Sequence, residues 1–107
     1  MQKVEKTEQF KEMVTENNKL VLVDIYADWC GPCKAMMPTL ESLEQKYSET
    51  LDIVKIDADN PDTGELTQLF QVRSIPTLLF IKNGEVQEAV IGAQPLSVLE
   101  KVINSLQ

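Results

Sequence analysis

The chain has 107 residues, enough for one domain that buries roughly two thirds of its unfolded surface and builds a core without cross-links. Its net charge of −7 disfavours nucleic acid and anionic membranes as partners, and its two cysteines are too few for a disulfide-dependent secreted scaffold. The first twenty residues lack the apolar run of a signal peptide or membrane span, which predicts a cytoplasmic protein.

The N-terminal part of the sequence predicts a helix followed by a buried strand. Phe10 and Met13 recur at helical spacing and predict a helix over residues 7–17, with Thr7 as its N-cap. The segment LVLVDIYA, residues 20–27, is apolar almost without interruption. Because clean alternation is typical of a strand with one solvated face, this run predicts a strand that is buried on both faces.

A second helix and a second buried strand follow. The segment LDIVKIDA, residues 51–58, predicts another buried strand, which completes a β-α-β unit. Pro38 lies inside the intervening helix and should kink it, because proline lacks the backbone N–H and displaces the carbonyl of Lys34. The apolar positions of this helix, whose methionines we assign to the core or its rim, are Met36, Met37, Leu40, Leu43 and Tyr47.

The second half of the chain predicts a short helix, a hairpin and a C-terminal helix. GELTQLF at 64–70 is the short helix, and the apolar runs within 76–92 are joined by Asn83-Gly84. Since Asn-Gly supplies the positive φ angles of a tight hairpin, the last two strands should be antiparallel. Pro95 suits the first turn of the final helix, whose apolar stripe is Leu96, Leu99, Val102, Ile103 and Leu106.

The order of these elements defines the fold class. A β-α-β unit followed by an antiparallel hairpin indicates an α/β fold, with a central mixed sheet flanked by helices on both faces. We find no internal repeat, low-complexity segment or linker, so residues 1–107 are expected to form a single domain.

Three uses of the cysteines can be weighed, since Cys30 and Cys33 stand in the stretch WCGPC. A disulfide that closes so short a loop restricts the unfolded chain by only about 2 kcal/mol, so a structural staple is disfavoured. A zinc site needs four ligands, and the chain has no histidine and no second C-x-x-C. A site completed by carboxylates, or a cluster shared between subunits, is less favoured than redox chemistry.

The position of the pair favours redox chemistry. Cys30 is predicted to close the buried strand and Cys33 to lie one turn inside the next helix, so the first sulfur faces the unpaired N–H groups and positive end of that helix. This environment favours the thiolate, which is the form that attacks disulfides. Cys30 is therefore the predicted nucleophile and Cys33 the resolving thiol, with Pro32 stiffening the loop between them.

At the level of motifs the chain resembles the thioredoxin family. The stretches DIYADWCGPCKAMMP, KIDAD, RSIPT, KNGE and IGA occur in the order and rough spacing of that family, from the first helix to the last. The resemblance implies the five-stranded thioredoxin fold and reduction of protein disulfides through a redox-active Cys30–Cys33 disulfide, without a bound cofactor or metal. It also implies a monomer that is re-reduced by an NADPH-dependent thioredoxin reductase.

Asp24 lies inside the strand predicted to be buried on both faces, where a carboxyl must be neutral or paired. From the residues alone, a buried functional carboxyl and an exposed strand-end carboxyl both stay open. The resemblance implies the first: Asp24 lies behind Cys33 and helps to move its proton, and Lys55 lies nearby and tunes Asp24. Taken alone, Lys55 would be a strand residue that extends its ammonium to water.

Pro76 precedes the first strand of the hairpin, and most X-Pro bonds are trans. The resemblance implies instead a cis Ile75-Pro76 bond beside the disulfide, with neighbouring backbone that pairs with an extended substrate. The implied docking residues around Cys30 are Trp29, Gly31, Pro32, Ser74, Ile75, Pro76, Ile91, Gly92 and Ala93.

Three departures from the family pattern bear on partner choice. Tyr26 stands where a tryptophan is common, Gln71 stands where a glycine is common, and the segment 61–66 is longer than in compact members. Two other functions also stay open. An oxidant or isomerase on the same fold is disfavoured by Gly31-Pro32, and a non-catalytic binding subunit would keep its activity after both cysteines are changed to serine.

Overall fold

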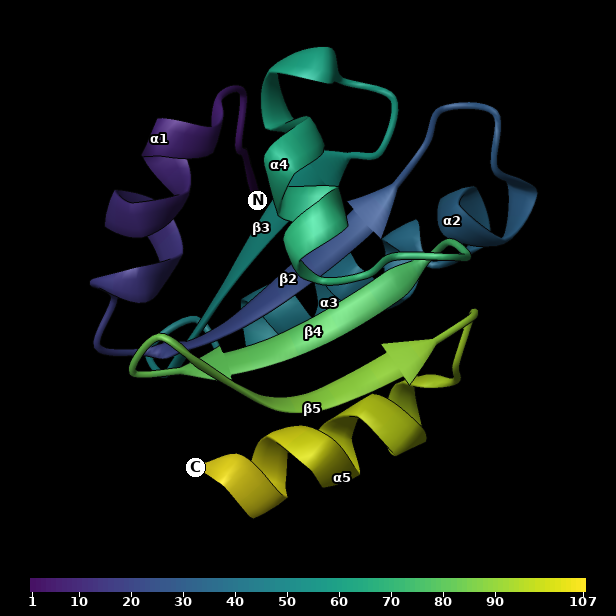
Figure 1. The fold of residues 1–107 in the computed structure, drawn as a ribbon. Coiled ribbons are helices and arrows are strands. Elements are labelled where there is room, and N and C mark those ends of the chain that lie inside the picture. The colour runs from purple at the N-terminus through teal and green to yellow at the C-terminus, as the bar shows by residue number, and fades with distance from the viewer.

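The computed structural model describes residues 1–107 and is built on one five-stranded mixed sheet, ordered β1-β3-β2-β4-β5 (Figure 1). β1, β3 and β2 run parallel, whereas β4 is antiparallel to β2 and β5 is antiparallel to β4. The strands are β1 Gln2–Lys3, β2 Leu20–Tyr26, β3 Leu51–Asp57, β4 Thr77–Lys82 and β5 Glu85–Ile91.

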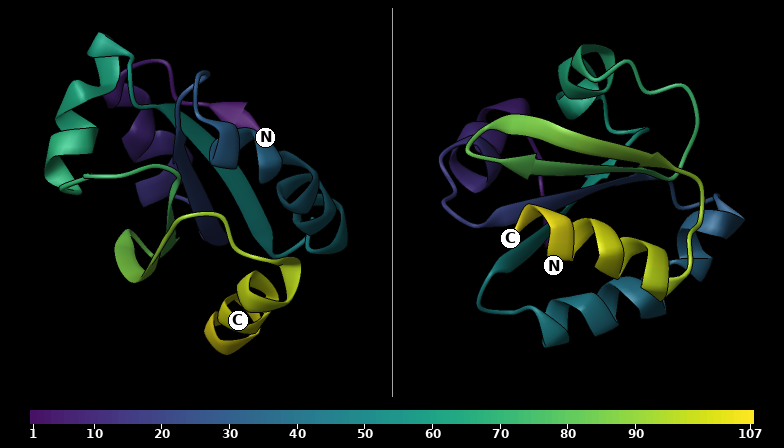
Figure 2. Two further views of the ribbon diagram at one scale, coloured as in Figure 1. Left: turned by 90° about the vertical axis from the view of Figure 1, so that its right-hand side faces the viewer. Right: turned by 90° about the horizontal axis from the view of Figure 1, so that it is seen from below.

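Helices cover both faces of the sheet, with α1 and α4 on one side and α3 and α5 on the other (Figures 1 and 2). None of them is long and apolar enough to span a membrane. The helical segments are α1 Thr7–Phe10, the π-helix η1 Lys11–Thr15, α2 Gly31–Ala35, α3 Met37–Lys46, the 3-10 helix η2 Pro61–Thr63, α4 Gly64–Leu69 and α5 Leu96–Leu106.

The core consists of two apolar layers separated by the sheet. Leu22 and Phe80 pack with α3 and α5 on one face, and Val23 and Ile81 pack with η1 and α4 on the other. β2 is central and buried along its whole length except at Tyr26. The prediction of a strand buried on both faces is therefore confirmed, and β2 carries Asp24 into the interior.

The predicted first helix begins at Thr7 as expected, but its N-cap, its end and its form differ from the prediction. Its N-cap is Lys6, and the Thr7 hydroxyl instead donates to the carbonyl of Asp62 at 3.1 Å. The Lys6 N–H donates to Gln9 Oε1 at 3.1 Å, and the Gln9 N–H donates to the Lys6 carbonyl at 3.0 Å, so the N3 amide has a partner without a hydroxyl cap. The second half of the helix widens to a π-helix that ends at Thr15, before the predicted end at residue 17.

The predicted second helix is two helices, which meet at Met36. Pro38 lies two residues beyond this junction, so a break at this point agrees with the predicted effect of a proline without an N–H. The Asn83-Gly84 hairpin is confirmed, with φ angles of 52° and 79°. Pro95 is the N-cap of α5 and not, as predicted, a residue of its first turn.

Candidate active site at the Cys30–Cys33 disulfide

The two cysteines form a disulfide at the N-terminus of α2. Cys30 is the N-cap of this helix, and its Sγ accepts a hydrogen bond from the Cys33 N–H at 3.2 Å. The predicted placement at a helix N-terminus is therefore confirmed. One detail is corrected: β2 ends at Tyr26, so Cys30 follows the strand through a short loop and does not close it.

The residues between the cysteines start the helix and leave space in front of it. Pro32 is the second residue of α2. The N–H groups of the first turn make no hydrogen bond within the helix, so the missing N–H of proline costs nothing there. A Cβ placed on Gly31 would meet no atom within 4 Å, so packing does not require glycine there. The absence of a side chain at Gly31 instead keeps the approach to Cys30 open.

A groove of about 560 Å³ lies in front of the disulfide. Trp29 stands at this groove with 71% of its side chain exposed, and its Nε1 donates to Asp59 Oδ2 at 2.7 Å. Sequence reasoning missed Asp59, although it belongs to the KIDAD stretch. Four residues of the groove lining were also missed, namely Ala58, Thr67, Val72 and Arg73. The rest of the lining had been predicted and consists of Trp29, Cys30, Gly31, Pro32, Ser74 and Ile75.

The segment before β4 passes beside Cys30. The Ile75-Pro76 bond is cis, and the Ile75 carbonyl oxygen lies 3.8 Å from Cys30 Sγ. Both atoms lack a proton in the disulfide form, so this approach is a contact and not a hydrogen bond. The exposed Ser74 and the half-buried Ile75 line the groove, whereas Pro76 is buried.

The remaining rim residues lie at the end of β5 and in the segment that follows it. Gly92 N–H donates to the Pro76 carbonyl at 2.8 Å, and Ile91 pairs with Thr77. Ile91 is 63% exposed, and Ala93 is exposed as well. Ile91, Gly92 and Ala93 do not line the groove, so this part of the predicted rim lies outside it.

Behind the disulfide lies a smaller cavity of about 90 Å³. Asp24 is only 1% exposed, and neither of its carboxyl oxygens has a hydrogen-bond partner. Burial raises the Asp24 pKa to about 6, and the positive charge of Lys55 opposes that rise. The exposed strand-end alternative is thus wrong. The cavity lining is Asp24, Tyr26, Ala27, Asp28, Cys33, Lys34, Met37 and Lys55.

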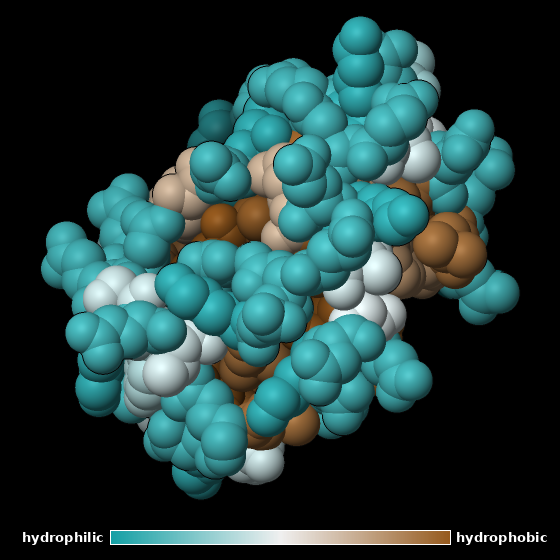
Figure 3. Space-filling view, turned by 90° about the vertical axis from the view of Figure 1, so that its left-hand side faces the viewer, coloured by the Kyte–Doolittle hydropathy of each residue, from teal (hydrophilic) through white to brown (hydrophobic).

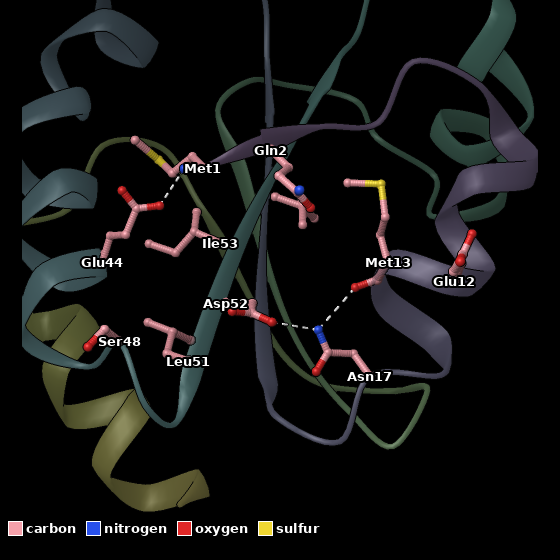
Figure 4. A pocket seen from close by; sticks show the side chains of 11 residues that line it. Met1, Gln2, Glu12, Met13, Asn17, Glu44, Ser48, Leu51, Asp52 and Ile53 are labelled. Carbon is pink, nitrogen blue, oxygen red and sulfur yellow. Dashed lines mark hydrogen bonds and ion pairs between the residues drawn. The ribbon is translucent and has the colours of Figure 1, made fainter.

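A third hollow, of about 550 Å³, lies away from the cysteines at the open edge of β3 (Figure 4). Asn17 Nδ2 donates there to Asp52 Oδ2 at 2.7 Å and to the Met13 carbonyl at 3.2 Å, and the terminal amine of Met1 pairs with Glu44. Hydrophilic side chains cover most of the side of the molecule on which α1 lies (Figure 3). None of the predicted site residues lines this hollow, and no group of three or more His, Cys, Asp or Glu side chains in the structure is placed to hold a metal ion.

Comparisons with known proteins agree with this geometry. The family model described as thioredoxin matches residues 1–105. A thioredoxin of Listeria monocytogenes is 50% identical over 86 residues, which cover 79% of this chain and 81% of that protein. A chloroplastic M-type thioredoxin of Spinacia oleracea is 46% identical over 90 residues, which cover 84% of this chain and 49% of that protein. A solved structure of Plasmodium falciparum thioredoxin superposes with a TM-score of 0.88 and 31% identity, covering all of both chains.

Proposed function

The chain belongs to the thioredoxin family and is a thiol–disulfide oxidoreductase, and we propose that it works as a reductant of disulfides in other proteins. The observation that carries this proposal is the position of Cys30 Sγ, which caps α2 and accepts the Cys33 N–H. In the reduced protein, the same N–H and the positive end of the helix stabilise a Cys30 thiolate. We propose Cys30 as the nucleophile for that reason.

The proposed reaction consists of two exchanges of sulfur partners. The Cys30 thiolate attacks one sulfur of the substrate disulfide, which forms a mixed disulfide and releases the other substrate sulfur as a thiolate. Cys33 then loses its proton and attacks Cys30 Sγ, which breaks the mixed disulfide and releases the second substrate thiolate. The substrate gains two electrons, and the protein is left with the Cys30–Cys33 disulfide.

Asp24 is the proposed acceptor of the Cys33 proton. Both residues line the cavity behind the disulfide, and its volume of about 90 Å³ leaves room for water between them. A carboxyl with a pKa near 6 exists in both forms close to neutral pH, so it can take up a proton and release it again. Lys55, on the neighbouring strand, is proposed to tune this equilibrium.

The groove in front of Cys30 is the proposed docking site for an extended segment of the substrate. Its apolar members include the exposed Trp29 and the half-buried Ile75, and the Ile75 carbonyl lies beside the sulfur of Cys30. Main-chain pairing with this segment would suit many substrates, because it recognises little of their side chains. Gly31 and Pro32 complete the groove, and Ile91, Gly92 and Ala93 extend the docking surface beyond Pro76.

We further propose that residues 1–107 form one monomeric domain, which an NADPH-dependent thioredoxin reductase re-reduces in the cytoplasm. The match of the family model to residues 1–105 and the similarity to the Listeria thioredoxin support this proposal, and the relative from Spinacia oleracea is chloroplastic. The redox-active group in this proposal is the disulfide itself.

A redox titration tests the direction of electron flow. The protein is equilibrated in dithiothreitol buffers of graded ratio, and the fluorescence of Trp29 reports the state of the adjacent disulfide. We expect a potential of about −270 mV, which is the value typical of thioredoxins and well below that of protein disulfide isomerase at about −180 mV.

The matched control is the double variant Cys30→Ser with Cys33→Ser, whose fluorescence should not respond to the buffer ratio. A potential above about −200 mV would contradict the proposal, because disulfides would then flow from this protein to its substrates.

A further inference from the structure

Three side chains of the cavity behind the disulfide are placed together by the sheet. Asp24 and Tyr26 are two residues apart on β2, so they point to the same face. Lys55 of β3 lies directly opposite Asp24 in the parallel register. All three line the cavity that also contains Cys33.

The Lys55 ammonium rests on an aromatic ring and not on the carboxyl. Its Nζ lies 4.2 Å from the centre of the Tyr26 ring, which is a favourable cation–π distance. Both carboxyl oxygens of Asp24 remain without a hydrogen-bond partner. The ammonium therefore influences Asp24 through space, without a direct bond.

Other charged groups, both acidic and basic, lie around the cavity. Asp28 and Lys34 line the cavity from the loop and from α2, and Asp57 follows Lys55 on β3. Lys3 of β1 approaches Asp57 at 4.0 Å. Burial raises the pKa of the Tyr26 phenol, the positive charge of Lys3 opposes that rise, and the neighbouring acids Asp57 and Asp28 add to it. The phenol therefore stays neutral, and the face of its ring is in contact with the Lys55 ammonium.

We propose that Tyr26 is a positioning residue, whose ring holds the Lys55 ammonium beside Asp24 but off its oxygens, and thereby controls proton exchange between Asp24 and Cys33. This inference rests on the proposed function and deepens it. An ammonium bonded to the carboxylate would make Asp24 a weak base. An ammonium that had moved to water would no longer oppose the effect of burial, so the Asp24 pKa would rise further and the carboxyl would release its proton less readily.

The test follows the Asp24 carboxyl directly, by ¹³C NMR titration of the oxidised protein. In Tyr26→Leu the apolar bulk remains but the aromatic face is lost, so Lys55 should extend toward water, Asp28 and Asp57. We expect the Asp24 pKa to rise by roughly half a unit or more. An unchanged pKa, or a fall, would overturn the proposal.

Two further variants separate the ring from other effects of the substitution. Tyr26→Phe keeps the aromatic face and loses only the hydroxyl, so the Asp24 pKa should stay at its original value. In a Lys55→Met background, Tyr26→Leu should shift the Asp24 pKa no further, because the ammonium is already absent. An equal shift in that background would mean that the ring acts by excluding water, and the proposal would be wrong.

Activity provides a second, independent readout. With insulin as the disulfide substrate, Tyr26→Leu should move the pH midpoint of kcat upward by the same amount as the Asp24 pKa and leave KM unchanged. A change in KM alone would contradict a positioning role. If the unaltered protein failed to reduce insulin, the proposed function would fail, whereas the NMR titration would still decide whether Tyr26 acts through Lys55.

Discussion

The two sides of the disulfide differ in size, exposure and charge. In front of Cys30, a groove of about 560 Å³ is open to solvent and carries the exposed indole of Trp29. Behind Cys33, a cavity of about 90 Å³ contains Asp24, which is almost fully buried. The sulfurs separate these regions, and Cys30 and Cys33 are themselves only 4% and 3% exposed.

The difference indicates a division of work within one site. An open apolar groove suits recognition of a polypeptide, because it offers area and backbone without demanding one side chain. A closed cavity with a buried carboxyl suits proton transfer, because burial brings the Asp24 pKa to about 6. Substitutions in the groove in front of Cys30 should therefore change KM, and substitutions in the cavity behind Cys33 should change kcat and its dependence on pH.

The largest expected effect lies at the boundary between the two regions. Cys30→Ser removes the nucleophile, so turnover should fall by about a thousandfold or more and no covalent adduct should form. Cys33→Ser should lose turnover to a similar extent but accumulate a mixed disulfide with the substrate. Mass spectrometry under non-reducing conditions measures the adduct. Adducts in both variants, or in neither, would contradict the assigned roles.

Asp24→Asn should give the next largest effect, on stability. The folded-state pKa of about 6 lies above the ordinary value of 3.8, so between these pH values the folded protein holds a proton that the unfolded chain releases. The free energy of unfolding should therefore fall as pH rises through this window, by about 3 kcal/mol in total. The amide that replaces the carboxyl cannot ionise, so the variant should be more stable than the original protein at pH 8 by about that amount and similar to it below pH 4.

Urea denaturation at a series of pH values measures this difference. The same variant should lower kcat by about 10- to 100-fold, because Cys33 must then pass its proton to water, and should leave KM unchanged. A variant with unaltered stability at pH 8 would show that the carboxyl is solvated in solution, and the contrast between the closed and open sides would fail.

Trp29→Ala tests the front of the disulfide. Loss of a large exposed aromatic from a docking surface should raise KM for a protein substrate by about 5- to 30-fold, which corresponds to about 1 to 2 kcal/mol. The pH midpoint of kcat should not move. Leu69→Ala is the matched control, since Leu69 is 69% exposed but does not line the groove. Equal effects of both substitutions would show that docking is not localised in the groove.

The predictable parts of the fold are those with a strong local signal. The apolar run of β2 and the Asn83-Gly84 turn are features of sequence alone, and both elements form as predicted. β1 contains only Gln2–Lys3 and shows no alternation of apolar residues. Only its pairing with β3 identifies it as a strand. The π-helical widening after Phe10 leaves no comparable signature in the sequence.

The site divides in the same way. The roles of Cys30 and Cys33 follow from their spacing and position, whereas the apolar run left the burial of Asp24 open and only the family resemblance implied it. The groove lining does not follow from the sequence, because Ala58, Thr67 and Val72 lie on separate segments that only the tertiary structure brings to Cys30. The contact of Lys55 with the Tyr26 ring depends on side-chain rotamers and was likewise not predictable from the sequence.

The smallest expected effect concerns the wall of the groove, where Gln71 has a φ of 53° between α4 and Val72. This left-handed conformation disfavours any residue with a Cβ, so Gln71→Gly should raise the free energy of unfolding by about 0.5 to 1 kcal/mol. Gln71→Ala removes the same side chain but keeps the strain, so it should not be stabilising. Neither variant should alter KM or the pH midpoint of kcat, because the backbone of the groove already has this shape. Equal stability of the two variants would mean that the backbone relaxes in solution, and the groove would then be less preformed than the cavity behind it.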